Sequence, residues 1–152
     1  MKFTTIEDIE APVAWVFKTI CNFDGYERAA MRRGAEVQRM DYMDSGMAWK
    51  AAFDMRGKRR EVDVKMVPFD ATNELNIFLT STGLDGLGHV ELLALSRNRT
   101  RLTAEFEIKP TNLSARLLVQ SMKLAKTSLT KRFKLRAALH AKDLEDRYKS
   151  ST

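Results

Sequence analysis

The stretch NLSARLLVQSMKLAKTSLTKRFKLRAALHAKDLEDRY, residues 112–148, decides the fold. It contains neither Gly nor Pro, and their absence is the first requirement for a long helix. Pro110 ends the preceding segment, and Thr111 or Asn112 can cap the first free amides. We therefore predict one unbroken helix whose apolar stripe needs a surface supplied by the rest of the chain. The stripe contains Ala115, Leu118, Val119, Met122, Ala125, Leu129, Phe133, Ala137 and Leu144.

Length and composition fit a single domain, residues 1–152. The apolar fraction of 44% and the charged fraction of 30% are typical of a folded globular chain. One cysteine, Cys21, excludes an intrachain disulfide and a cysteine-rich zinc site. The segment MKFTTIEDIEAP has no signal-peptide pattern, and no window is apolar enough for a membrane span. We expect a cytoplasmic domain.

The order of elements follows from a change in hydrophobic period. Residues 3–9 alternate as a strand, Pro12 starts a helix over 12–22, and a second helix is expected over 26–32. From Gly34 onward the period is two, as in Trp49, Ala51 and Phe53. Gly and Asn clusters separate six such segments, which predicts an antiparallel meander with one apolar face.

The first part of the chain contains Ile9-Glu10-Ala11-Pro12, Val16-Phe17, Ile20, Asn22-Phe23-Asp24 and Tyr26-Glu27. With these residues, the order of elements resembles the START-like superfamily, also called the Bet v 1-like or polyketide cyclase/dehydrase and lipid transport group. The resemblance implies an α+β helix-grip fold, β-α-α-β6-α, with a curved antiparallel sheet wrapped round the long C-terminal helix and an apolar cavity between them. Where many members carry a Trp after the Tyr, this chain has Arg28-Ala29-Ala30-Met31.

Large and pliable side chains are candidates to line that cavity. Methionine adapts to irregular shapes and packs on aromatic faces, although the same residue types also build an ordinary core. The candidate ligand-cavity residues are Trp49, Phe53, Met55, Met66, Phe106, Leu118, Met122, Leu129 and Phe133.

Basic residues are expected at one end of the meander, where alternate connections meet. A basic rim there could hold the head of an anionic amphiphile or make transient contact with an anionic membrane, or it could be a solvated hairpin. The glycine-containing segment 83–88 is expected to be a loop beside this rim, with the freedom of a lid. The rim candidates are Arg32, Arg33, Arg56, Lys58, Arg59 and Arg60.

Catalytic motifs are scarce in the sequence. It has no Gly-rich phosphate loop, no H-E-x-x-H, no G-x-S-x-G and no C-x-x-C, and its two histidines lie far apart, so we expect no metal and no cofactor. His89 and Glu91 share one face of a strand and could form an acid-base pair if that face were inward. Val90, Leu92 and Ala94 make the opposite face a good inward candidate, which would leave His89 and Glu91 in solvent.

The net charge of the chain and a second apolar strip on the long helix indicate which macromolecules the protein could bind. The net charge of +6 permits weak phosphate contact, but no nucleic-acid motif appears, so we expect no specific nucleic acid. The second strip could pack on the first two helices or on another copy of the chain in a homodimer. It consists of Leu117, Leu124, Leu135 and Leu139.

The predicted function is to carry, sequester or sense a small hydrophobic or amphipathic molecule, such as a lipid, inside the cavity. The alternative is an enzyme of the polyketide cyclase/dehydrase kind using the same cavity. An enzyme needs a titratable group at depth, whereas a carrier needs few inward polar groups.

Overall fold

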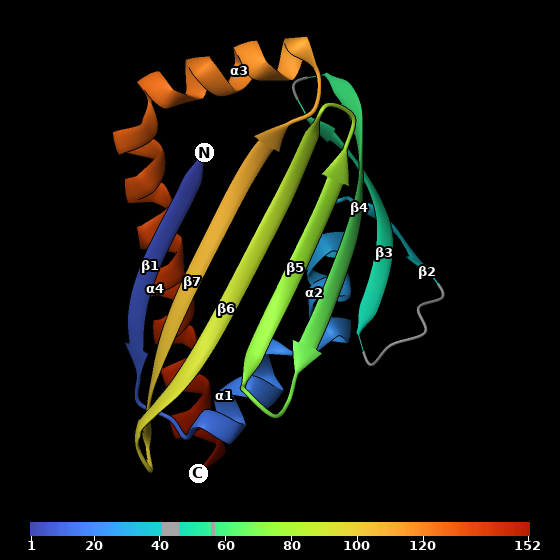
Figure 1. Ribbon diagram of the computed structural model, residues 1–152. Helices are drawn as coiled ribbons and strands as arrows, with labels where there is room; N and C mark the ends of the chain where they lie inside the picture. Colours follow the sequence, from blue (N-terminus) through green and yellow to red (C-terminus); the bar gives the residue numbers. More distant parts are fainter. Residues whose placement is uncertain (41–45, 56) are drawn as a thin grey trace.

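A computed structural model describes residues 1–40, 46–55 and 57–152, with the backbone alone at Met55. Seven strands form one curved antiparallel sheet in the order β1-β7-β6-β5-β4-β3-β2, and the helices lie on one side of it and across one end (Figure 1). The predicted order β-α-α-β6 and the α+β helix-grip fold are confirmed. The elements are β1 (Lys2–Ile9), α1 (Val13–Ile20), α2 (Phe23–Arg32), β2 (Glu36–Met40), β3 (Met47–Met55), β4 (Lys58–Phe69), β5 (Glu74–Ser81), β6 (Leu84–Ser96), β7 (Arg99–Pro110), α3 (Leu113–Leu124) and α4 (Lys126–Ser151).

The C-terminal segment is two helices, so the prediction of one unbroken helix is wrong. Ala125, with φ −102° and ψ 15°, separates α3 from α4, and the two helices run in different directions (Figure 1). Their 12 and 26 residues would make a straight helix of about 57 Å, whereas the longest strand, of 13 residues, spans about 43 Å. A straight helix would overhang the sheet. The bend lets α3 cross the sheet end and α4 follow β1. No helix in the described segments is long and apolar enough to span a membrane.

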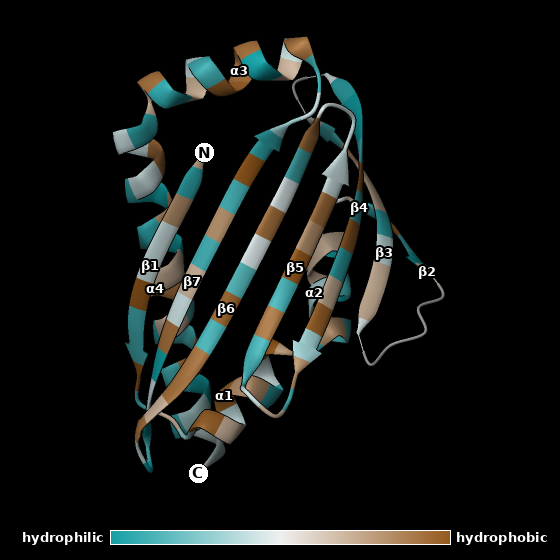
Figure 2. Cartoon of the chain, in the orientation of Figure 1, coloured by the Kyte–Doolittle hydropathy of each residue, from teal (hydrophilic) through white to brown (hydrophobic). Residues whose placement is uncertain are grey.

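The sheet has an inner face, which carries Phe3, Trp49 and Phe106 and which the helices contact. Its outer face carries the alternate residues, and the strands accordingly alternate in hydropathy (Figure 2). Helix α4 packs on the inner face of β1, where the rings of Phe133 and Phe3 lie 5.7 Å apart. The alternation therefore put the apolar side chains on the face that the helices can cover.

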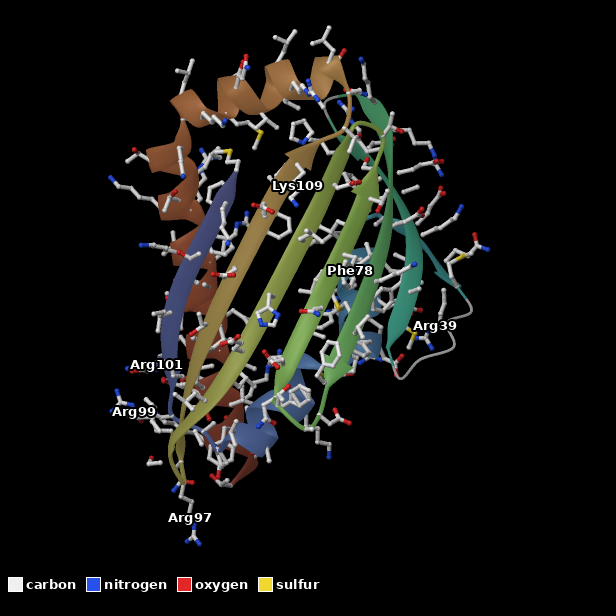
Figure 3. All side chains as sticks on the ribbon, viewed as in Figure 1. Arg39, Phe78, Arg97, Arg99, Arg101 and Lys109 are labelled. Carbon is white, nitrogen blue, oxygen red and sulfur yellow. The ribbon has the colours of Figure 1, made fainter. Side chains whose placement is uncertain are left out.

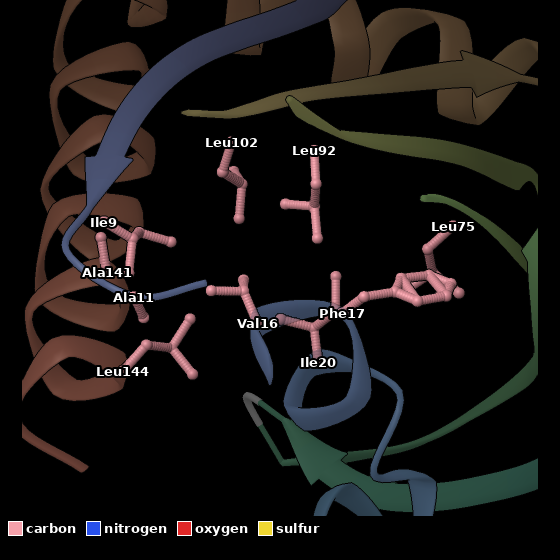
Figure 4. Close-up of a cluster of buried hydrophobic side chains, with 10 residues drawn as sticks. All are labelled: Ile9, Ala11, Val16, Phe17, Ile20, Leu75, Leu92, Leu102, Ala141 and Leu144. Carbon is pink, nitrogen blue, oxygen red and sulfur yellow. The ribbon is translucent and has the colours of Figure 1, made fainter. Parts of the chain in front are cut away.

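The buried core lies at one end of the inner face, beneath α1 and the C-terminal half of α4 (Figure 4). We call this the α1 end and the opposite end, where α3 crosses, the α3 end. At the α1 end the Thr100 hydroxyl donates a buried hydrogen bond of 2.8 Å to the carbonyl of Ala11. The core contains Ile9, Ala11, Val16, Phe17, Ile20, Leu75, Leu92, Leu102, Ala141 and Leu144.

Helix α2 is attached to the sheet through Trp49. The Trp49 ring is 5% exposed and packs edge-on against Phe23, with ring centroids 6.1 Å apart. Its Nε1 donates to Glu27 Oε2 at 2.9 Å, and Arg39 donates to the same carboxylate. These hydrogen bonds, that from Trp49 first, hold the pKa of Glu27 below its usual range.

We expect Glu27→Gln to lower the free energy of unfolding at neutral pH. Glutamine can still accept from Trp49 but lacks the charge that Arg39 meets. A carboxylate with a depressed pKa stabilises the fold above its unfolded pKa, and this contribution is lost as the pH falls through the folded pKa. Urea unfolding of both proteins from pH 7 downward should therefore show the stability difference shrinking in acid. A difference independent of pH would contradict the ionic role.

The expectation of a loop over residues 83–88 is wrong, because Gly86 and Gly88 lie inside β6. A Cβ on Gly86 would lie 3.1 Å from both Leu79 Cβ and Phe106 Cζ. These glycines therefore let the Phe106 ring lie against the backbone of β6. Of the three glycines in segment 83–88, only Gly83, with φ +84°, occupies a turn conformation that favours glycine.

We expect Gly86→Ala to destabilise the fold by about 1–3 kcal/mol, the usual cost of overpacking. Adding Phe106→Leu should restore part of that loss, because the shorter side chain removes the Cζ that the new methyl group meets. Chemical denaturation of the two single variants and the double variant measures this coupling. Strictly additive effects would show that Phe106 is not the obstacle.

Candidate functional site

The candidate site is the inner face between the core and the α3 end. Phe106 stands beside Gly88 on one side and Phe3 on the other, and Met66 pairs with Ile77 across β4 and β5. The protein leaves this region only partly covered, in contrast to the buried core next to it. The half-buried apolar residues here are Ala51, Phe53, Val62, Val64, Met66, Ile77, Leu79, Ala104, Phe106 and Ile108.

The structure brings several of the predicted cavity residues together. Phe53, Met66 and Phe106 share the inner face, with Trp49 beneath α2. From the C-terminal helices come Met122, Leu129 and Phe133, all half-buried, whereas Leu118 on α3 is 48% exposed. The side chain of Met55 lies outside the described part of the chain.

Two hollows were not foreseen from the sequence. One, of about 300 Å³, lies between α1, α2 and α4 and is lined in part by Tyr26, Arg28, Arg32, His140 and Leu144. The other, of about 590 Å³, lies over β2–β5 on the outer face, and its lining is largely polar. Both depend on residues distant in sequence, which periodicity does not place.

Three of the predicted basic rim residues, Lys58, Arg59 and Arg60, lie at the α3 end. Arg32 and Arg33 finish α2, and Lys58 begins β4 beside Arg59 and Arg60; all five are exposed. Arg59 donates to Glu36 at 2.6 Å, which joins the first residues of β4 and β2. That bond lowers the pKa of Glu36 and raises that of Arg59. Arg56 lies outside the described residues.

Arg60 is the rim residue nearest the candidate site. The register pairs it with Phe53, so both lie on the inner face of the sheet. Within the described chain the Arg60 side chain forms no ion pair. It is therefore a free cation at the border of the half-buried apolar surface.

His89 and Glu91, the acid-base candidates, lie on the outer face. His89 Nδ1 is 2.5 Å from Asn76 Oδ1, and its Nε2 lies 3.0 Å from Glu91 and 3.2 Å from Glu74. Glu74, His89 and Glu91 are close enough for one metal ion to bridge them, yet all three are partly exposed and already contact one another. Their neighbours Val90 and Leu92 occupy the inner face, away from this cluster.

Cys21 lies half-buried at the end of α1. Burial, helped by the charge of Asp70, raises its pKa to about 11. Nearby, Tyr26 donates from its hydroxyl to the Ile20 carbonyl at 2.6 Å, and burial raises its pKa to about 12. Neither group is ionised at neutral pH, so this region offers no ready nucleophile.

We expect Cys21 to react with a disulfide reagent at pH 8 roughly a hundredfold more slowly in the folded protein than in urea, where a free thiol has a pKa of about 8.5. The raised pKa leaves very little thiolate in the native state. The absorbance of the thiol released from the reagent, followed over time with and without urea, gives the ratio of the two reaction rates. Equal rates would show that Cys21 is neither buried nor perturbed.

No family model and no curated protein sequence matches this chain. Solved structures do match over nearly its whole length. The protein TTHA0849 from Thermus thermophilus aligns with TM-score 0.68 and 14% identity, covering 100% of this chain and 99% of that one. The Zhui aromatase/cyclase from Streptomyces sp. R1128 aligns at 0.62 and 14%, covering 86% and 88%. A START superfamily protein from Mycobacterium smegmatis aligns at 0.53 and 10%, covering 86% and 95%.

Proposed function

Because this chain has the START-like, Bet v 1-like helix-grip fold, we propose that it binds a small hydrophobic or amphipathic molecule, such as a lipid, against the inner face of its sheet. The observation that carries the proposal is the half-buried apolar surface between the core and α3. Apolar area removed from water is worth roughly 25 cal/mol per Å². A molecule with an apolar body gains that free energy by covering Met66, Ile77 and Phe106.

The chemistry of the surface selects the class of molecule. Inner positions on β5, β6 and β7 hold only uncharged side chains, so the body of the ligand is apolar. Arg60 stands at the border, where an anionic head can meet it while the body lies against the sheet. An anionic amphiphile, such as a long-chain carboxylate, satisfies both requirements.

The alternative, a polyketide-cyclase-like enzyme, draws on the likeness to the aromatase/cyclase. Such an enzyme needs a titratable group within reach of its substrate. The acid-base candidates His89 and Glu91 are on the outer face, and the inner positions of β5–β7 supply no substitute. This arrangement favours carrying, sequestering or sensing over catalysis.

The test is titration of a fluorescent long-chain fatty acid with matched variants. Ile77 and Phe78 are neighbours on β5 that face opposite sides of the sheet (Figure 3). We expect Ile77→Gln to weaken probe binding about tenfold, equivalent to about 1.4 kcal/mol, and Phe78→Gln to leave it unchanged. Equal effects, or no binding to the unaltered protein, would contradict the proposal.

Two further variant pairs refine the outcome. Arg60→Glu should weaken the acid probe, whereas Arg97→Glu makes the same charge change at the opposite end of the sheet and should not (Figure 3). The pair His89→Gln and Glu91→Gln should bind the probe like the unaltered protein. Loss of binding in either one would move the site to the outer face.

A further inference from the structure

Helix α3 has two apolar faces, and only one is covered. Ala115 and Val119 are buried towards the sheet. On the other side Leu113 is 72%, Leu117 59% and Leu124 92% exposed. Spacings of four and seven residues place these three leucines on one line along the helix. We call this line the leucine ridge; no part of the described chain covers it.

The ridge sits in the most basic part of the chain. From Ile108 to Lys142 there is no Asp or Glu but there are nine Lys and Arg, so this segment has a charge of +9 and the rest of the chain −3. Arg116 and Lys123 flank the ridge and Lys126 follows it, all exposed. Within the described residues none of the three forms an ion pair.

Other free cations lie at the same end of the molecule. Helix α3 crosses the end of the sheet where β3, β5 and β7 finish (Figure 1). Lys58 and Arg60 begin β4 at this end, and neither forms an ion pair within the described part of the chain. Exposed leucines and unpaired cations therefore share the α3 end.

We infer that the α3 end docks on an anionic lipid bilayer. Leucine side chains enter the boundary between headgroups and acyl chains, and Lys and Arg near an anionic surface each add attraction. A nucleic acid would meet the cations but leave the leucines in water. A second copy would bring cations against cations. This inference goes beyond the proposed function. It rests on that function only for the expectation that the bound molecule enters and leaves at the α3 end.

The experiment is co-sedimentation with vesicles of neutral phosphatidylcholine, with and without phosphatidylserine. The ridge variant is Leu113→Gln/Leu117→Gln/Leu124→Gln, since glutamine is a good helix former. Its matched control is Leu135→Gln/Leu139→Gln on α4, where the side chains are 59% and 62% exposed but lie outside the ridge. The charge variant is Arg116→Glu/Lys123→Glu. Circular dichroism checks that every variant is folded.

We expect binding to phosphatidylserine vesicles that falls at least tenfold in the ridge and charge variants but not in the α4 control. Added salt should weaken it. Equal loss in the α4 control, binding unaffected by phosphatidylserine, or no binding at all would overturn the inference. The inference would also be overturned if light scattering showed that the unaltered protein is a dimer and that the ridge variant is a monomer. Fatty-acid titration of the same variants distinguishes the two proposals, because the ridge lies apart from Ile77 and its loss should leave the soluble probe bound.

Discussion

The break at Ala125 is the constraint on which the rest of this structure depends. A sheet of long curved strands exposes an inner face that needs a cover, and α4 covers it only along β1, through contacts such as Phe133 on Phe3. Helix α3 turns across the end of the sheet instead. The middle of the inner face is left partly covered, so its apolar side chains are half-buried.

Other contacts position the helices around the inner face. Helix α1 covers the α1 end of the inner face with the core around Val16 and Phe17. The Trp49–Glu27 hydrogen bond holds α2 against β3, and the hollow of about 300 Å³ separates α2 from the C-terminal half of α4. The inner face between these helices is apolar and half-buried.

The sequence predicts the strands better than the helices or the site. Alternation survives in β3–β7 because most inner side chains meet an apolar neighbour across the sheet, with Arg60 opposite Phe53 as an exception. Gly86 and Gly88 indicated a loop because glycine is a turn signal, whereas the Phe106 ring, eighteen or more residues away, is what requires them. Ala125 gave no warning of a break, since alanine is the best helix former and tertiary packing overrode its preference. The face taken by His89 followed from Val90 and Leu92 only once the strand register was fixed.

The positions of the basic residues can be read from the sequence, but whether each one has an acidic partner depends on the fold. The segment at residues 56–60 is the densest basic run in the first half of the sequence, yet Arg59 is neutralised by Glu36, which only the pairing of β2, β3 and β4 brings near. The cations of α3 lie in a segment with no acid of its own and remain unpaired among the described residues. The bend at Ala125 that uncovers the inner face also turns these cations and the leucine ridge outward at the α3 end. One departure from a straight helix therefore produces both the half-covered apolar surface and the basic, apolar surface beside it.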